Sequence, residues 1–211
     1  MTHPIKDAKC KKCRRAGEKL FIKGDRCNSP KCAMVSRNFP PGMHGAGRYT
    51  KLTAYGKQLK EKQKAKRIYG LREKQFRNYF ETALQKDGNT GELLFASLEN
   101  RLDSTVYRLG LAPSLNAANQ LVGHGHIIVN GKKVDIPSYS LKIGEVVSLR
   151  DKSKKSTLFT DIEQSLTNKK DTVSWLNMDI KTLEGKVTGM PRLGDAEMSI
   201  DWQVIVEFYS R

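Results

Sequence analysis

The sequence predicts an α+β protein in three parts: a metal-clipped N-terminal segment, a helical domain, and an inserted α-then-β module with a small antiparallel sheet. Three observations support this prediction. Four cysteines stand in two close pairs within the first 32 residues, apolar residues recur at helical spacing between residues 51 and 110, and an Asn-Gly dipeptide separates two β-rich runs near residue 130. We place the parts at residues 1–50, 51–98 and 99–189, and we expect residues 190–211 to pack with the second part.

The four cysteines have the spacing C-x2-C-x13-C-x4-C. Each close pair can bind one metal ion from a tight turn, and the loop between the pairs lets them meet around it. Zinc would supply on the order of 10 kcal/mol of folding free energy to a segment with little apolar core of its own. Neighbouring lysines and arginines would lower the pKa of the thiols and offset the negative charge of the site. The predicted ligands are Cys10, Cys13, Cys27 and Cys32.

Three other roles for the cysteines compete with zinc binding. An iron–sulfur cluster uses the same four thiolates, and the spacing does not distinguish it from zinc. A redox-active pair is disfavoured because no βαβ pattern surrounds the first two cysteines. Disulfides are disfavoured because we expect the chain in the cytoplasm, where glutathione keeps thiols reduced. That expectation rests on the lack of a signal-peptide core and of any apolar run near the roughly 20 residues of a membrane helix.

Residues 38–110 divide into a loop and three helical stretches. Prolines and glycines in NFPPGMHGAG (38–47) exclude a regular helix and predict an extended segment. Each of the three helical stretches that follow has an apolar stripe and a glycine at its end. The stripes are Leu52, Tyr55 and Leu59; Phe76, Tyr79, Phe80, Ala83 and Leu84; and Leu94, Leu98, Leu102, Val106 and Leu109.

Residues 111–152 predict a short helix followed by a small sheet. Ser114 can cap the helix LNAANQLV. Asn130-Gly131 in HIIVNGKKVDI indicates a tight hairpin, and EVVSLR (145–150) adds a further strand. Beyond the module, LFTDIEQSL (158–166) has an amphipathic helical pattern, and WQVIVEFYSR (202–211) is predicted to be an apolar strand.

The distribution of charge indicates a polyanionic partner. The 211 residues carry a net charge of +16. Residues 1–80 contain 22 Lys and Arg against 5 Asp and Glu, whereas residues 81–211 contain 16 against 17. Positive charge of that density repels itself unless a polyanion neutralises it, and a long phosphate backbone is the obvious candidate. An anionic membrane is the alternative, but the basic segment lacks the bulky apolar face of an interfacial helix.

Basic and aromatic residues alternate between residues 55 and 80. Basic side chains can bind phosphates, and aromatic rings such as Tyr55, Tyr69 and Tyr79 can stack on unpaired bases. A solvated charged face is the alternative, but only Glu61 and Glu73 offset the positive charge between residues 51 and 80. The RNA ligands predicted in this half of the chain are Lys9, Lys11, Lys12, Arg14, Arg15, His44, Lys57, Lys60, Lys62, Lys64, Lys66, Arg67, Arg72, Lys74, Arg77 and Asn78.

Residues 114–149, SLNAANQLVGHGHIIVNGKKVDIPSYSLKIGEVVSL, resemble the small RNA-binding module named after the fourth small-subunit ribosomal protein. The stretches Gly125-His126-Ile127 and Val129-Asn130-Gly131-Lys132 carry the match. In that family the helix displays arginines toward RNA, whereas this chain has Leu115, Asn116 and Asn119 there. The RNA ligands predicted in and beside the module are Arg101, Arg108, Asn119, Gln120, His124, His126, Asn130, Lys132 and Lys133.

Further motifs extend the resemblance over nearly the whole chain. FIKGDRCNSPKCAM, PPGMHG, LKEKQKAKRIYGLREKQFRNYF, LENRLDSTVYRLG and VIVEFYSR follow in order, as in the four-cysteine form of the bacterial fourth small-subunit ribosomal protein. The resemblance implies a structural, non-enzymatic component of the small subunit that binds 16S-type rRNA and nucleates assembly of its 5′ domain. It also implies a role in translational accuracy with the neighbouring fifth small-subunit protein, and a place along the mRNA entry path. RNA binding follows from the charge as well, whereas the other roles rest on the resemblance alone.

Two other functions fit part of the sequence. A pseudouridine synthase with the same module needs a large catalytic domain with an essential aspartate in an Arg-Leu-Asp context. Arg101-Leu102-Asp103 occurs here inside a predicted leucine-striped helix, so we expect Asp103 to be a surface acid, and the roughly 60 residues after the module are too few for that domain. A stand-alone stress-type RNA chaperone would need neither the metal cage nor the C-terminal strand. We therefore predict a ribosomal protein with no membrane or small-molecule partner.

Overall fold

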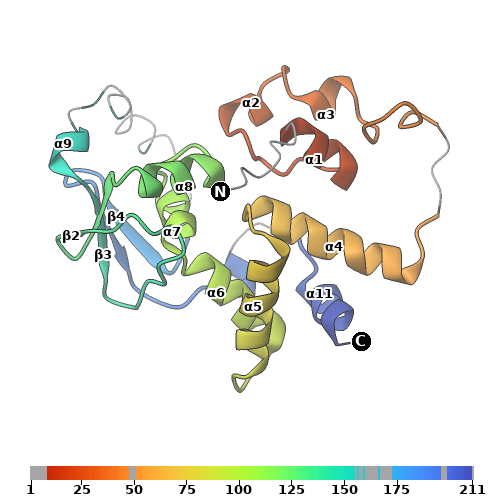
Figure 1. Cartoon of the computed structure of the whole chain (residues 1–211). Helices are drawn as coiled ribbons and strands as arrows, with labels where there is room; N and C mark the ends of the chain where they lie inside the picture. The colour runs from red at the N-terminus through yellow and green to blue at the C-terminus, as the bar shows by residue number, and fades with distance from the viewer. Residues whose placement is uncertain are drawn as a thin grey trace. The chain divides into compact units, whose positions relative to one another are not determined.

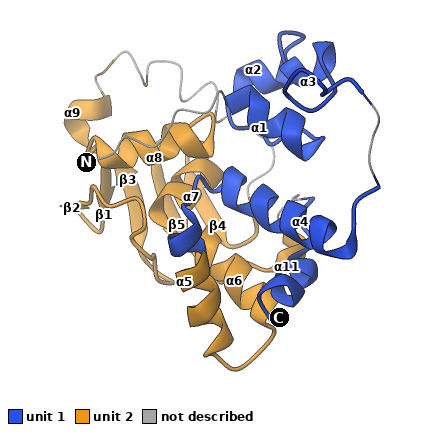
Figure 2. Ribbon diagram, turned by 45° about the vertical axis from the view of Figure 1, so that its right-hand side comes forward, with its two compact units in different colours: residues 1–76, 199–211 blue, residues 77–198 orange. Residues whose placement is uncertain are grey.

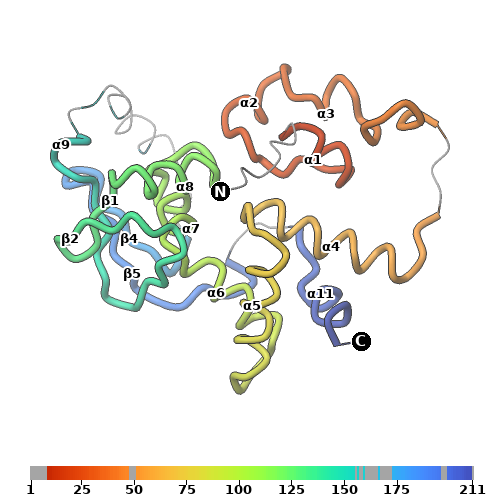
Figure 3. Tube along the Cα trace, in the orientation of Figure 1, coloured from red at the N-terminus to blue at the C-terminus, as the bar shows by residue number. Residues whose placement is uncertain are grey.

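The computed structural model describes residues 9–47, 51–154, 156, 159, 166, 173–195 and 199–210. The predicted α+β class is confirmed (Figure 1). The helices are α1 Lys9–Ala16, α2 Asp25–Asn28, α3 Ala33–Ser36, α4 Ala54–Ile68, α5 Glu73–Leu84, α6 Thr90–Glu99, α7 Leu102–Arg108, α8 Leu115–Gly123, α9 Asp151–Lys154, α11 Trp202–Tyr209 and the 3-10 helix η2 Leu193–Asp195. The strands are β1 Ile127–Val129, β2 Lys132–Lys133, β3 Val146–Leu149, β4 Leu176–Asp179 and β5 Glu184–Val187. Figure 3 traces this path along the chain.

Contacts within the chain define two compact units (Figure 2). Unit 1 consists of Met1–Phe76 and Ser199–Arg211, and unit 2 consists of Arg77–Met198. The boundary falls inside α5 and so differs from the three segments predicted from the sequence. The predicted amphipathic helix at 158–166 lies outside the described residues, apart from Phe159 and Leu166, which are both buried.

Polar caps determine where four of the helices begin. The residue before α4, α6, α8 and α11 accepts a hydrogen bond through its side chain from a backbone N–H two or three positions further on, which satisfies a donor that the helix leaves free. These caps are Thr53, Asn89, Ser114 and Asp201, with distances of 3.1, 3.0, 3.3 and 3.2 Å. The predicted cap at Ser114 is therefore confirmed.

The C-terminal stretch is a helix, α11, and the prediction of a strand was wrong. Valine, isoleucine and aromatic residues favour strands in isolation, and a short apolar run does not distinguish the two structures. Trp202 and Ile205 are buried, and the ring of Tyr209 stacks on Phe76 with 6.3 Å between centroids. Trp202, Ile205 and Tyr209 follow one another at intervals of three and four residues, so they lie on one face of the helix. Through this face α11 packs along α4. Burial of that face therefore favours a helix over the predicted strand.

The predicted leucine-striped helix is interrupted at Asn100 and Arg101, where α6 ends and α7 begins. Arg101 has an extended backbone, with φ −67° and ψ 143°. Segment 137–141 replaces the missing helical hydrogen bonds: the N–H groups of Leu102 and Asp103 donate to the carbonyls of Tyr139 and Pro137 at 2.8 and 3.2 Å. The break depends on a partner segment more than 30 residues further along the chain, which the local pattern does not reveal.

Unit 2 contains a five-stranded antiparallel sheet with the order β2-β1-β3-β5-β4. The predicted hairpin is confirmed: Asn130 and Gly131 both have positive φ, 48° and 78°, as a tight two-residue turn requires. The sheet also contains β4 and β5, which the sequence analysis missed. A Cβ atom on Gly185 of β5 would lie 2.4 Å from the side chain of Leu109, so only glycine lets this strand approach the end of α7 so closely.

An ion pair between Arg101 and Asp103 lies in the interior of unit 2. Arg101 donates from Nε and Nη2 to the two carboxylate oxygens at 3.0 and 2.7 Å, and from Nη1 to the hydroxyl of Tyr79 at 2.8 Å. The backbone N–H of Ser104 and the Nδ2 group of Asn119 donate to the same carboxylate, each at 2.9 Å. Burial alone would lower the pKa of Arg101, but its hydrogen bonds and proximity to Asp103 raise it. Asp103 is 3% exposed, so the expectation of a surface acid was wrong.

A second set of charges holds α4, α5 and α11 together in unit 1. Lys62 donates to Glu73, which also accepts from Lys66 at 2.8 Å and from the hydroxyl of Tyr209 at 3.0 Å. The ammonium group of Lys62 lies over the ring of Phe208, 4.6 Å from its centroid. Burial alone would raise the pKa of Glu73, but the hydrogen bonds from Lys62, Lys66 and Tyr209 lower it from 4.5 to about 2.

Removing the carboxylate of Asp103 is expected to destabilise unit 2 strongly. Asp103→Ala leaves a buried guanidinium without its counter-ion, which costs about 3–5 kcal/mol of unfolding free energy. Urea unfolding followed by the fluorescence of Trp175, in a Trp202→Phe background, measures this loss within unit 2. Asp135→Ala is the control, because its pair with Lys133 is exposed and 3.6 Å long, so its loss should stay below about 1 kcal/mol. Equal losses in the two variants would contradict the structural role of the buried pair.

The stability of unit 1 is expected to depend on the ionisation of Glu73 in acid. Because its folded pKa is lowered from 4.5 to about 2, its contribution is complete above pH 4.5 and is lost as the pH falls toward 2. The contribution should be about 1 kcal/mol, since 46% of this side chain is exposed to solvent. Acid unfolding followed by Trp202 fluorescence, in a Trp175→Phe background, should be less steep over this range in Glu73→Gln. Asp25→Asn, which removes an exposed carboxylate of the same unit, should keep the wild-type profile; a Glu73→Gln profile that matches it would refute the assignment.

Candidate nucleic-acid interface

The basic run on α4 and α5 separates into exposed cations and cations with a structural role. Among the described residues, Lys57, Lys60, Arg72 and Lys74 are exposed and form no ion pair. Asn78 is also exposed, and exposed Arg77 pairs with Glu81 one turn away at 2.9 Å. These side chains stand free to meet phosphates along two consecutive helices.

Lys62 and Lys64 are buried, at 5% and 4% exposure, and their predicted role as RNA ligands is not supported by their position. Lys62 is committed to Glu73, and Lys64 pairs with Glu18 and Glu61 at 3.0 and 2.9 Å and donates to the backbone carbonyl of Ser199. Burial alone would lower the pKa of Lys64, but its carboxylate partners raise it. Lys66, which also pairs with Glu73, and Arg67 are half-buried.

The tyrosines of this run contact other side chains of the protein. Tyr55 lies against Phe208 and Tyr69 lies against Trp202, with 5.7 and 6.4 Å between ring centroids. The ring of Tyr79 lies 5.6 Å from the Arg101 guanidinium. The aromatic rings that were expected to stack on bases therefore have protein partners, although Tyr55 remains 52% exposed.

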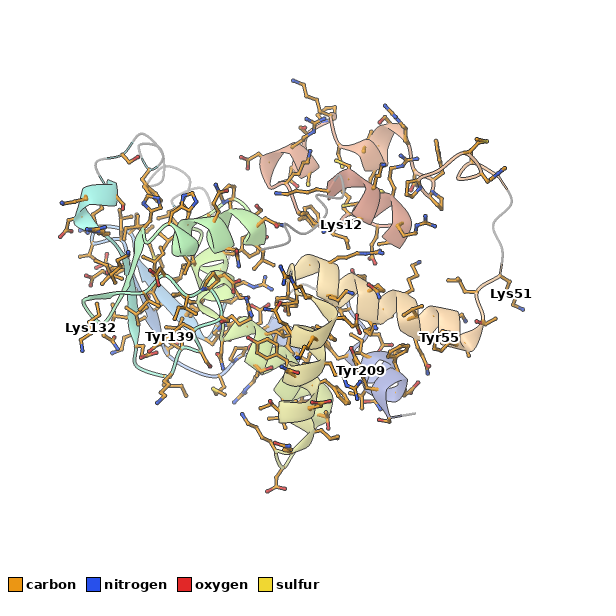
Figure 4. All side chains as sticks on the ribbon, in the orientation of Figure 1. Lys12, Lys51, Tyr55, Lys132, Tyr139 and Tyr209 are labelled. Carbon is orange, nitrogen blue, oxygen red and sulfur yellow. The ribbon has the colours of Figure 1, made fainter. Side chains whose placement is uncertain are left out.

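The N-terminal segment presents a second group of cations. Lys9, Lys11 and Arg15 on α1 are exposed, and Lys12 is half-buried (Figure 4). Arg14 instead holds the loop that follows α3. Its Nε and Nη2 donate to the carbonyls of Phe39 and Pro40 at 2.9 and 3.3 Å, and its guanidinium lies 4.7 Å above the Phe39 ring.

The loop at residues 38–47 is a series of tight turns, where an extended segment was predicted. The N–H groups of Gly45 and Gly47 donate to the carbonyls of Gly42 and His44 at 3.2 and 3.1 Å. His44 is exposed on this loop, so the structure leaves it accessible to a partner.

The four cysteines lie in the same small part of unit 1, and all are free thiols. Cys13, Cys27 and Cys32 are buried and Cys10 is half-buried. Burial raises the pKa of Cys13, and the other three cysteines raise it further, which opposes the lowering expected from nearby lysines. The backbone N–H of Lys23 donates to Cys27 Sγ at 3.4 Å. Within the described residues, no three His, Cys, Asp or Glu side chains are close enough to form a metal site.

In the module, the hairpin carries two exposed lysines, Lys132 and Lys133 (Figure 4). Asn130 at its turn has a structural role: its side chain accepts from the N–H of Val146 at 2.9 Å and donates to Glu145 at 3.3 Å. Arg108, another predicted ligand, donates from Nε and Nη2 to buried Glu99 at 2.8 Å. Arg101 is buried and Arg108 is half-buried, and both pair with buried carboxylates of unit 2. The expectation that these two arginines bind phosphate is therefore not supported.

A basic group that the sequence analysis did not select lies beside the Gly-His-Gly-His turn. Exposed His124 lies next to half-buried His126, whose Nδ1 is 2.9 Å from the hydroxyl of Ser153 in α9. Exposed Lys152 and Lys154 flank Ser153 in the sequence of α9, and Lys154 pairs with Asp151 at 3.7 Å and donates to the carbonyl of Thr182 at 3.4 Å. The run KSKK was the sequence signal for this cluster, but its proximity to the histidines comes only from the fold.

Helix α8 contributes amides in place of cations. Asn119 and Gln120 are exposed, and α8 contains no charged residue. The part of the chain that the structure describes has no helix of the length and apolarity needed to cross a membrane. The chemistry of the exposed predicted residues is therefore that of cations, imidazoles and amides spread over two units, which suits a large anionic and polar ligand.

Comparison with known proteins identifies the family. Residues 5–99 match the family described as "Ribosomal protein S4/S9 N-terminal domain", and residues 100–147 match "S4 domain". The chain is 53% identical to small ribosomal subunit protein uS4A of Alkaliphilus metalliredigens over 206 residues, which cover 97% of this chain and 98% of that protein. It is 50% identical to uS4 of Koribacter versatilis over 206 residues, 98% of each chain, and 51% identical to uS4 of Halothermothrix orenii over 205 residues, 96% of each chain. The chain therefore belongs to the uS4 family of small ribosomal subunit proteins.

Proposed function

We propose that this protein is a structural component of the small ribosomal subunit that binds small-subunit rRNA through its exposed basic residues. The observation that carries the proposal is a set of exposed cations without an ion pair, namely Lys57 and Lys60 on α4, Arg72 just before α5, and Lys74 on α5. Lys11 and Arg15 on α1 and Lys132 on the hairpin extend this set. These cations suit a ligand with many phosphates. Each contact between a cation and a phosphate releases a counterion and so adds to the affinity.

Family membership supports the same proposal. The relatives named above are small ribosomal subunit proteins, and they align with this chain over nearly its full length. None of these names denotes an enzyme, and we assign the chain no catalytic activity. The Arg101-Leu102-Asp103 sequence, which a pseudouridine synthase would use in catalysis, is here a buried structural element.

The finer roles follow from the family resemblance and form part of the proposal. We infer that the protein binds the 5′ domain of the rRNA early in assembly, where several RNA helices meet. We further infer that it lies beside the fifth small-subunit protein, where it contributes to translational accuracy, and along the mRNA entry path. The exposed lysines of α4 and α5 suit phosphates of either RNA.

We also propose that Cys10, Cys13, Cys27 and Cys32 hold one structural zinc ion. The chemistry of the four thiols fits zinc. The thiols do not stand at ligand distance from one another in the described residues, but Cys10, Cys27 and Cys32 lie near enough to Cys13 to raise its pKa, which supports a common ligand. Bound zinc would favour the thiolate form of all four side chains, which burial of Cys13 otherwise opposes. Among the described residues, the apolar cluster of this segment consists of Cys13, Ala16, Leu20 and Ile22, with Met34 and Ile68 packed against it, so the segment has little core of its own.

Binding of the protein to a 16S rRNA 5′-domain transcript is expected to weaken steeply as salt rises. In a filter-binding titration, Lys60→Gln and Lys74→Gln should each lower affinity and reduce the slope of log K against log salt by about 1, because each removes one phosphate contact. Lys86→Gln is the matched control, because it removes the same charge from an exposed residue beyond the end of α5. A flat salt dependence of the wild-type protein, or a chain found only in the free fractions of a low-salt sucrose gradient of lysate, would contradict the proposed function.

The purified protein is expected to contain about one zinc ion per chain. Cys10→Ser together with Cys13→Ser should abolish zinc binding and speed proteolysis of residues 9–47, while unit 2 stays folded, because the metal stabilises only its own segment. Metal analysis and limited proteolysis with mass spectrometry measure both effects. Ser36→Ala, an exposed change in the same segment, should retain the metal. Iron with visible absorption would indicate a cluster, and metal-free protein with unchanged proteolysis would refute the metal site.

A further inference from the structure

Asn119 is the residue of α8 whose side chain is both exposed and held in a defined orientation. It lies on the exposed face of the helix, and its Nδ2 group donates to Asp103 Oδ2 at 2.9 Å. That carboxylate is 3% exposed and belongs to the buried pair with Arg101. One end of the Asn119 amide is therefore anchored in the interior of unit 2.

The anchor determines which end of the amide faces outward. A carboxylate with no proton only accepts hydrogen bonds, and Asp103 already accepts from Arg101 twice and from the N–H of Ser104 once. Asn119 must therefore present its NH2 group to Asp103, and the carbonyl oxygen Oδ1 takes the opposite side. Among the described residues no hydrogen bond to Oδ1 is found. Oδ1 is consequently a free acceptor with a fixed direction, and the second N–H of the NH2 group is the remaining donor of the side chain.

As a hydrogen-bond acceptor, Asn119 Oδ1 binds different groups of RNA from those that lysines and arginines bind. A phosphodiester has no hydrogen to donate, so Oδ1 is unsuited to the backbone phosphates that lysines bind. The donors that RNA offers are the 2′-hydroxyl of the ribose and the amino groups of the bases. Because α8 contains no charged residue, no cation of this helix attracts a phosphate in competition with this contact.

We propose that Asn119 is a specificity-determining residue of the module, which accepts a hydrogen bond from a donor group of the RNA through an oxygen that Asp103 holds outward. The inference rests on the proposed RNA-binding function and adds to it a contact that reads RNA chemistry instead of charge. Asp103 acts in it as a positioning residue, because it touches Asn119 and has no RNA contact of its own.

Nucleotide analogue interference on the 16S 5′-domain transcript tests this contact with the full chain. One set of transcripts carries 2′-deoxynucleotides, and a second carries inosine or purine riboside, which lack the amino groups of guanine and adenine. Wild-type protein should show interference at one nucleotide that disappears with Asn119→Ala. Disappearance in the first set identifies a 2′-hydroxyl as the donor, and disappearance in the second identifies a base amino group.

Salt dependence supplies an independent readout. Asn119→Ala should weaken binding by about 5- to 10-fold, the effect of one hydrogen bond, and should leave the salt slope unchanged. Asn119→Asp keeps acceptors but loses the NH2 anchor and meets the Asp103 carboxylate, so it should weaken binding at least as much. Lys132→Gln is the contrasting variant, because it should reduce the salt slope by about 1.

Two outcomes would overturn the inference. Identical interference maps for wild type and Asn119→Ala would show that the side chain reads no donor. Unchanged affinity of Asn119→Ala would show that the contact is absent. Failure of the proposed function itself is separate, since it would appear as weak, salt-independent binding of the wild-type protein.

Discussion

The ion pair of Arg101 and Asp103 connects four elements of unit 2 at the break between α6 and α7. Its guanidinium reaches Tyr79 of α5, and its carboxylate accepts from the N–H of Ser104 at the start of α7 and from Asn119 of α8. The backbone of Asn100–Asp103 pairs with segment 137–141. A buried charge without its partner costs several kcal/mol, so these elements form only together. The same carboxylate that stabilises the core also orients an exposed amide on the surface of the module.

Unit 1 divides its many cations between structure and surface. Lys62 and Lys64 are enclosed by carboxylates, aromatic rings and a backbone carbonyl, whereas Lys57, Lys60, Arg72 and Lys74 face solvent. Glu18, Glu61 and Glu73, three of the few acidic residues in this half of the chain, are the partners of the buried lysines. The scarce negative charge is thus used to bring α4, α5 and α11 together, and the remaining positive charge is left for the RNA that we propose as the ligand.

Features with a short-range physical cause were predictable from the sequence. The Asn130-Gly131 turn needs two residues that tolerate positive φ, and Ser114 supplies a side-chain acceptor where a helix begins. The apolar stripes marked the helices, and ordered motifs over the whole chain led to the correct family. Features with a long-range cause were missed: the break at Asn100, strands β4 and β5, and the hydrogen bond between His126 and Ser153 of α9.

The sequence by itself therefore determined the family, the α+β class, the local turns and caps, and the concentration of positive charge in the first 80 residues. The tertiary structure alone decided that the C-terminal run is a helix, that Asp103 is buried, and which cations are exposed. The physical reason is the range of the forces involved. Backbone preference and local hydrogen bonds act between neighbours in the chain, whereas burial of an apolar face or of a charge depends on residues such as Tyr139 or Glu18 that are distant in sequence and meet only in the fold.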